Sequence, residues 1–231
     1  MTSPTTATQL VEALWAARSD GELPKVRKRL ADDEEAFGLR MRDLFALAKQ
    51  ATDLPATELH RLLDHPAYEP RMAAMCILDF KARRRLDDEQ RRELFETYLD
   101  RHDRITTWDM VDRSAPRVVG GYLAGRSPDP LHDLAAHDDP LRRRTAITAP
   151  LAFIHGSDAD LAGAFAIAAR LAEDPDPTVH KPVGIFLKHA STRDASRVQR
   201  FLDDHATTMA RPAVRLAIEK LDPDQRRRYL A

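Results

Sequence analysis

Short, closely spaced breaks constrain the fold of this 231-residue chain more than any other feature. Between the breaks, apolar residues recur at three- or four-residue spacing, as at Leu10, Leu14 and Ala17, which is the period of an amphipathic helix. The breaks combine Pro, Gly and Asp, and many place Asp or Ser directly before Pro, which suits a helix N-cap followed by its first turn. The chain is thereby divided into about a dozen helical segments of roughly 10 to 20 residues, with no strand-like alternation.

Helices joined by such short connections pack as antiparallel pairs, and a row of pairs stacks into a solenoid. The corresponding breaks at Pro140 and Pro177 lie about 37 residues apart, within the range of HEAT and armadillo repeats. No stretch has the composition of an interdomain linker. We therefore expect one all-α domain over residues 1–231, a curved α-solenoid of antiparallel helix pairs of the HEAT-like or armadillo-like type.

Composition excludes several classes of protein. Hydrophobic residues make up 43% of the chain and charged residues 32%, a soluble globular profile. The one cysteine, Cys76, cannot form an internal disulfide and indicates a reducing cytoplasm. Because Cys76 lies in an apolar run, we expect a buried structural thiol and not a nucleophile. No segment approaches the ~20 apolar residues of a membrane span, so neither export nor a membrane anchor is expected.

The basic residues are clustered although the formal net charge is −1. Most of the 36 are arginine, the better bidentate ligand for phosphate, and three arginine triplets occur at 83–85, 142–144 and 226–228. Only the charge on a binding face matters for phosphate contacts. Each triplet could equally be a solvated helix end, so charge alone does not establish a nucleic acid partner.

The most informative segment for function is Trp108-Asp-Met-Val-Asp112. On a helix Trp108 and Asp112 share a face, and an indole beside a carboxylate suits a cation. Two other interpretations stay open: Trp108 could pack in the core, and Asp112 could cap a helix that begins near Ser114. Asp109 points elsewhere on the helix, and we interpret it as structural.

This segment and several others resemble the bacterial DNA alkylation repair proteins, the AlkD-like DNA glycosylases built from HEAT-like repeats. The resemblance covers about residues 34–230. Matching segments occur in the same order along the chain: Phe37-Gly-Leu-Arg-Met41, Pro66 to Arg71, Arg101-His-Asp-Arg-Ile105, Arg143-Arg-Thr-Ala-Ile147, His180-Lys181 with Gly184, and Phe201-Leu-Asp-Asp-His205.

The resemblance implies a glycosylase that excises positively charged N3- or N7-alkylated purines from duplex DNA in base-excision repair. Asp112 would be the catalytic carboxylate that stabilises the oxocarbenium, and Trp108 would contact the cationic lesion. A second aromatic of the family falls on Phe186, or on Ile185 if the register shifts by one residue. Phe is a weaker cation–π partner than Trp, which puts the substrate range in question.

The resemblance also implies contacts with the DNA backbone. Arg143 and Arg144 match a pair of arginines in the family, of which we expect one to face the DNA and the other to pack internally. Arg215 and Lys181 are further candidates, although Arg215 could instead pair with Glu219, four residues on.

No cofactor or metal is expected, because the histidines and the one cysteine show no metal-ligand spacing and no nucleotide-binding or nucleophile motif occurs. We expect a cytoplasmic monomer whose partner is double-stranded DNA carrying alkylated bases. The alternative function is a non-catalytic helical-repeat scaffold that binds DNA or protein, which the fold class alone would favour.

Overall fold

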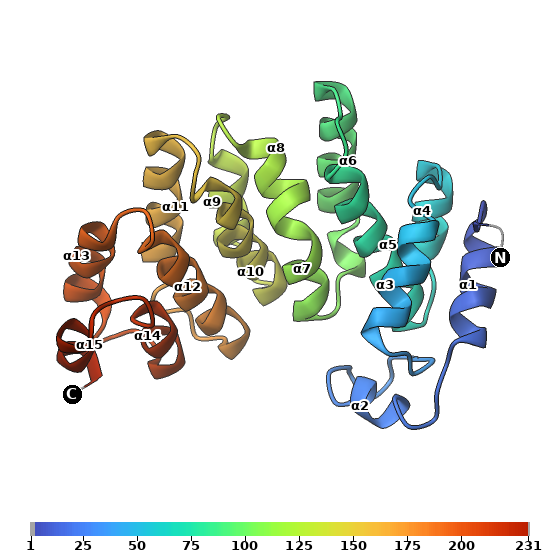
Figure 1. Ribbon diagram of the computed structural model, residues 1–231, viewed down its shortest axis with the longest axis horizontal. Coiled ribbons are helices and arrows are strands. Elements are labelled where there is room, and N and C mark those ends of the chain that lie inside the picture. Colours follow the sequence, from blue (N-terminus) through green and yellow to red (C-terminus); the bar gives the residue numbers. More distant parts are fainter. Residues whose placement is uncertain (1–2, 231) are drawn as a thin grey trace. The chain divides into compact units, whose positions relative to one another are not determined.

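A computed structural model describes residues 3–230 and divides into two compact units, Met1–Ser114 (unit 1) and Ala115–Ala231 (unit 2). Figure 1 follows the chain through its helices from α1 to α15. Within the described residues there is no strand, only an isolated parallel bridge between Glu35 and Ala67. The predicted all-α class is confirmed. A single domain over the whole chain stays a prediction, and each unit is described by itself.

Unit 1 is built around one central helix. Its elements are α1 Ala7–Ala16, α2 Leu23–Arg27, α3 Met41–Gln50, α4 Ala56–Leu63, α5 Tyr68–Ala82, α6 Asp88–Asp100, the 3-10 helix η1 His102–Arg104, and α7 Trp108–Ala115, whose last residue is the first of unit 2. Helix α5 contacts α1, α3, α4 and α6. Every residue of α5 from Tyr68 to Asp79 is buried, as expected of a helix surrounded by others.

The buried run of α5 contains Cys76, which is fully buried and unpaired by any disulfide. Burial raises the pKa of this thiol to about 12, so it stays protonated and unreactive at neutral pH. The predicted structural thiol is therefore confirmed.

In unit 2, alternate helices stack on one another. Its elements are the π-helix η2 Pro116–Gly120, α8 Gly121–Leu123, α9 Asp129–Ala135, α10 Pro140–Thr148, the 3-10 helix η3 Ala149–Phe153, α11 Asp158–Arg170, α12 Pro177–Ala190, α13 Ala195–His205, α14 Arg211–Ala217 and α15 Pro223–Leu230. Helix α12 lies between α10 and α14 and contacts both, whereas α9 and α11 contact each other and α10. This two-layer arrangement is that of stacked helical repeats.

The helix starts of unit 2 follow from the sequence breaks. Pro140 and Pro177 are the first residues of α10 and α12, and the carboxylates of the preceding residues, Asp139 and Asp176, each accept a hydrogen bond of 2.8 Å from the backbone two residues on. An aspartate cap followed by a first-turn proline favours the start of a helix. The two helix starts that mark the predicted repeat therefore have the same local cause.

Two glycines allow helices to approach closely. A Cβ added at Gly120 would lie 2.0 Å from the carbonyl oxygen of Ala149, and one added at Gly184 would lie 2.4 Å from that of Ala213. Gly120 therefore lets η2 pack against η3, and Gly184 lets α12 pack against α14. The glycine of the His180-Lys181-x-x-Gly184 segment thus has a packing role.

Candidate functional site

Helix α7 carries the two residues that the sequence singles out. Its side chains differ in burial: Met110 and Val111 are buried, whereas Trp108 is 44% exposed and Asp112 is half-buried. Trp108 and Asp112 are four residues apart on this helix and share its outer face, here called the α7 face. The prediction that one helical face presents both an indole and a carboxylate agrees with this geometry.

The two alternative interpretations of these residues do not fit. A side chain exposed as far as Trp108 is not part of the core. Helix α7 begins at Trp108, runs through Asp112 to Ala115, and continues into the π-helix η2. Asp112 therefore lies inside a helix, and the alternative that it caps a helix beginning near Ser114 does not hold.

Arg113, the neighbour of Asp112, fixes α7 to the rest of unit 1. Its guanidinium lies between two aromatic rings, 4.5 Å from the centroid of Phe45 and 4.8 Å from that of Phe80. It also pairs with the fully buried carboxylate of Asp79 at 2.9 Å. Adjacent helical residues point about 100° apart, so this inward contact leaves Asp112 directed toward the α7 face.

Asp109 is buried, and three hydrogen bonds reach its carboxylate from Tyr68, Thr107 and Arg29. The interpretation of Asp109 as structural agrees with this environment. Tyr68, Arg29 and Arg113 could not be identified from the sequence. Nothing in their local sequence marks them, because their partners lie far away along the chain.

The structure corrects the prediction for Phe186. This side chain in α12 has no exposed surface and packs edge-on against Phe165, with 5.4 Å between ring centroids. A residue inside the core of unit 2 cannot contact a DNA lesion, so the predicted lesion contact is wrong. The alternative position, Ile185, is half-buried and shares a face of α12 with the exposed Lys181, four residues earlier. The side chain beside Phe186 that reaches the surface is therefore aliphatic and not aromatic.

The structure also corrects the prediction that Arg143 or Arg144 faces DNA. Arg143 donates to the carboxylate of Asp174 and to the backbone carbonyls of His137 and Asp138, which occupies four of its five N–H groups. Arg144 is 5% exposed and donates to the carbonyl of Thr178. Both guanidiniums join neighbouring segments of unit 2, that of Arg144 from a buried position and that of Arg143 from a half-buried one.

Lys181 and Arg215 remain as candidates for backbone contacts. Both side chains are exposed, on α12 and α14 respectively. Glu219, the partner that Arg215 could have taken, pairs with Lys188. These two positions therefore keep their cationic groups at the surface of unit 2.

Two of the three arginine triplets, 83–85 and 226–228, lie toward the C-terminal ends of α5 and α15 and contain arginines that form ion pairs. Arg83 and Arg84, just beyond the end of α5, pair with Asp79 and Asp53. Arg227 and Arg228 of α15 pair with Asp224 and Asp203. Because the arginines of these pairs are 41 to 73% exposed, the contacts favour the interpretation of these two triplets as solvated helix ends.

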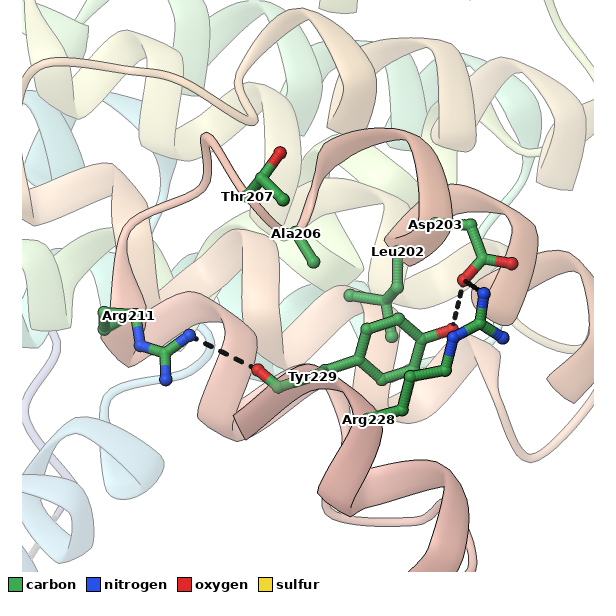
Figure 2. A pocket seen from close by; sticks show the side chains of 7 residues that line it. All are labelled: Leu202, Asp203, Ala206, Thr207, Arg211, Arg228 and Tyr229. Carbon is green, nitrogen blue, oxygen red and sulfur yellow. Dashed lines mark hydrogen bonds and ion pairs between the residues drawn. The ribbon is translucent and has the colours of Figure 1, made fainter. Parts of the chain in front are cut away.

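A cavity of about 400 Å³ lies at the end of unit 2 and is shown in Figure 2; its lining residues are Leu202, Asp203, Ala206, Thr207, Arg211, Arg228 and Tyr229. Its polar groups are paired with one another: the Tyr229 hydroxyl donates to Asp203 at 2.7 Å, and Arg228 pairs with the same carboxylate at 3.0 Å. Arg211 donates to the carbonyl of Leu230 at 2.9 Å. These contacts hold α15 against α13 and α14, and none of the predicted site residues lines the cavity.

Among residues 3–230, no group of three or more His, Cys, Asp or Glu side chains is arranged to hold a metal ion. Over the same residues, no helix combines the length and apolarity needed to cross a bilayer.

The stacked helices are those of an all-α helical-repeat protein, and one of its helices exposes an indole beside a carboxylate. Residues 10–221 match the family model described as DNA alkylation repair enzyme. The chain therefore belongs to the DNA alkylation repair enzyme family, and this membership supports a role in alkylation repair.

One solved structure, described as a predicted DNA alkylation repair enzyme from Enterococcus faecalis, is similar to this chain. The TM-score is 0.65 at 14% sequence identity, with 89% of this chain and 97% of that one covered. At this identity the likeness shows the fold alone. Comparison with curated proteins finds no match.

Proposed function

We propose that this protein is a DNA glycosylase that excises N3- or N7-alkylated, positively charged purines from duplex DNA. The observation that carries the proposal is the α7 face, where the 44% exposed indole of Trp108 lies one helical turn from the half-buried carboxylate of Asp112. Membership of the alkylation repair family supports the choice of substrate.

Such a reaction requires little from the protein beyond a well-placed negative charge. The bond between C1′ of the deoxyribose and the base nitrogen breaks, and its electron pair leaves with the base, which becomes neutral. Positive charge then develops on the sugar as an oxocarbenium. The carboxylate of Asp112 stabilises this charge and orients a water molecule that attacks C1′ and loses its proton, leaving an abasic site.

Trp108 contributes to binding of the cationic base. The face of an indole attracts positive charge, and a cation held over it gains about 0.5 to 2 kcal/mol, depending on desolvation. A neutral purine gains less from this electrostatic attraction. The indole therefore favours the alkylated base over its unmodified counterpart.

Contacts with the DNA backbone are assigned to Lys181 and Arg215, which keep exposed cationic groups on unit 2. Each phosphate contact releases about one counterion. Replacing both residues with Ala should therefore reduce the slope of log binding constant against log salt by about two. An unchanged slope would place the DNA contacts elsewhere.

The catalytic assignment is tested by Asp112→Asn, with excision measured as abasic sites formed in duplex oligonucleotides carrying N7-methylguanine or N3-alkyladenine. The amide keeps the shape and removes the charge, so the excision rate should fall at least about tenfold while the helix content is unchanged. Asp100→Asn, at the exposed end of α6, is the control. Equal rates for wild type and Asp112→Asn would overturn the assignment.

The chain offers a matched test of the indole, because its two tryptophans are exposed to similar extents, Trp15 at 50% and Trp108 at 44%. Trp108→Phe should slow excision by roughly two- to fivefold, through weaker cation–π attraction. Trp15→Phe should not change the rate. Duplex binding without excision by wild-type protein on any cationic lesion would instead favour the non-catalytic scaffold.

A further inference from the structure

Three donors converge on the buried carboxylate of Asp109, immediately after Trp108. The Tyr68 hydroxyl donates to Oδ2 at 2.8 Å, the Thr107 hydroxyl donates to Oδ1 at 2.6 Å, and Nη1 of Arg29 donates to Oδ2 at 3.1 Å. Asp109 is 8% exposed and Tyr68 is fully buried. A buried carboxylate satisfied from three directions is held in one orientation, because the loss of any donor leaves a desolvated charge undercompensated.

The third of these donors comes from a distant part of unit 1. Arg29 begins the segment 29–38 between α2 and α3, here called the strap. The Thr106 hydroxyl donates to Glu34 of the strap at 2.7 Å, and Glu34 also pairs with Arg71 of α5. The strap therefore contacts the chain on both sides of Trp108, at Thr106 and at Asp109.

The strap is itself fixed to the start of α5. The Tyr68 amide donates to the Glu35 carbonyl at 2.8 Å, and the carboxylate of Glu69 accepts from the amides of Phe37 and Gly38 at 2.8 and 2.7 Å. Glu69 is fully buried. These bonds give the strap a defined position from which it can support α7.

The position of Trp108 makes this support relevant to the α7 face. Trp108 is the first residue of α7, and the first four backbone N–H groups of a helix have no intrahelical partner. In proteins, helices obtain most of their stability from tertiary contacts. Without the anchor at Asp109, the first turn would be prone to fray, and the indole would lose its fixed place relative to Asp112.

We propose that Asp109, with Tyr68, Thr107 and Arg29, is a positioning cluster that holds Trp108 and Asp112 in the geometry required for excision. None of the four needs to touch DNA. This inference rests on the function proposed above for the α7 face. Burial and the charge of Asp109 raise the pKa of Tyr68 well above its ordinary range, so its hydroxyl remains a donor at physiological pH.

The test compares Tyr68→Phe with Tyr229→Phe. Both substitutions remove a hydroxyl that donates to an aspartate, to Asp109 at 2.8 Å and to Asp203 at 2.7 Å, but only the first affects the cluster. Each is made in a Trp15→Phe background, where Trp108 is the only indole of the chain. Quenching of its fluorescence by acrylamide then reports the mobility of the α7 face directly, without requiring activity.

Tyr68→Phe should raise the quenching constant of Trp108 and lower the single-turnover excision rate by roughly tenfold, because a displacement of about 1 Å suffices for such losses. Affinity for undamaged duplex should change by less than about twofold, since no phosphate contact is removed. Tyr229→Phe should change neither quenching nor excision. Identical quenching in the two variants would overturn the proposal, whatever the excision assay shows.

A second pair of variants at Thr107 tests the cluster without altering Tyr68. Thr107→Val removes the hydroxyl at nearly constant volume and should reproduce the quenching and excision of Tyr68→Phe, whereas Thr107→Ser keeps the donor and should restore wild-type values. Failure of serine to rescue would contradict the role of the hydrogen bond. Absence of excision in wild type together with the expected quenching changes would reject the glycosylase function and leave the anchoring of Trp108 intact.

Discussion

Arg143 of α10 and Asp174, in the connection before α12, form a bidentate ion pair, from Nε to Oδ2 at 2.6 Å and from Nη2 to Oδ1 at 3.1 Å. The same guanidinium donates to the carbonyls of His137 and Asp138 at 2.9 and 2.7 Å. One side chain thus joins the connection before α10 to the connection before α12. Asp174 is only 8% exposed, and the guanidinium of Arg143 is the cation that pairs with its carboxylate.

We expect Arg143→Ala to destabilise the protein by about 3 to 5 kcal/mol, because it leaves a buried carboxylate without its cation. Urea unfolding measures the difference. Arg215→Ala, at an exposed position of α14, should change stability by less than about 0.5 kcal/mol. The slope of log binding constant against log salt for duplex DNA, measured below the melting temperature, should be reduced by Arg215→Ala and unchanged by Arg143→Ala. A reduced slope with unchanged stability in Arg143→Ala would mean that this arginine faces DNA.

The second prediction concerns the core of unit 2. Phe186→Trp places a larger ring where no exposed surface remains and should cost roughly 1 to 3 kcal/mol through overpacking. Ile185→Trp, at the half-buried neighbouring position, should cost less. Melting temperatures of the two variants compare the positions directly. A stable Phe186→Trp protein with an altered preference between small and bulky lesions would contradict the assignment of Phe186 to the core.

Adjacent glycines provide the third prediction. Gly120 and Gly121 both have helical backbone angles, with φ of −63° at each. A Cβ at Gly120 would overlap the Ala149 carbonyl, whereas one at Gly121 would meet nothing within 4 Å. Gly120→Ala should therefore destabilise by roughly 1 to 3 kcal/mol or more, and Gly121→Ala should stabilise by about 0.4 to 1 kcal/mol. Equal effects in thermal unfolding would show that η2 does not pack closely on η3.

The fourth prediction concerns the dependence of stability on pH. Nδ1 of His65 accepts a hydrogen bond from the Ala67 amide at 3.0 Å, which requires the ring nitrogen to be unprotonated. Burial lowers the pKa of His65 below its ordinary value of 6.5, with the charge of Arg71 acting in the same direction against the opposing effect of Glu35. The folded protein therefore binds a proton at His65 less readily than the unfolded chain does.

The contribution of His65 to stability should be fully present above pH 6.5 and should be lost as the pH falls through the lower pKa of the folded state. His65→Asn keeps an acceptor and does not titrate, so wild type should lose more stability than this variant between neutral and mildly acidic pH. His155→Asn, at an exposed position, is the control for removing a histidine. If the free energy of unfolding fell equally with pH in wild type and His65→Asn, a contribution of His65 to the pH dependence would be excluded.

Those parts of the fold that depend on local chemistry could be predicted from the sequence. The Asp139-Pro140 and Asp176-Pro177 pairs mark helix starts because both the capping carboxylate and the proline act within one turn. The shared face of Trp108 and Asp112 likewise follows from the helical period alone.

The errors at Arg143, Arg144 and Phe186 have a different origin. An arginine that pairs with a carboxylate 31 residues away has the same local sequence as one that binds phosphate. The side chains of Ile185 and Phe186 point about 100° apart around the helix. If the match to the family is shifted by one residue, the position assigned to lesion contact therefore moves from the core to the surface. Tyr68 could not be found for the same reason as Arg143, since its partner Asp109 is 41 residues distant.

The strap has a consequence for the order in which the chain folds. In unit 2 the bonds between helices close short loops: Arg143 and Asp174 are 31 residues apart, and Arg144 and Thr178 are 34 apart. The contact between Arg29 and Asp109 in unit 1 closes a loop of 80 residues. Relative to a loop of 34 residues, this closure costs about 0.8 kcal/mol more in chain entropy. Helical pairs with local contacts form early, whereas distant contacts wait until the intervening chain is ordered. We therefore expect the contact between the strap and the first turn of α7 to form late in folding, after the helices between them are in place.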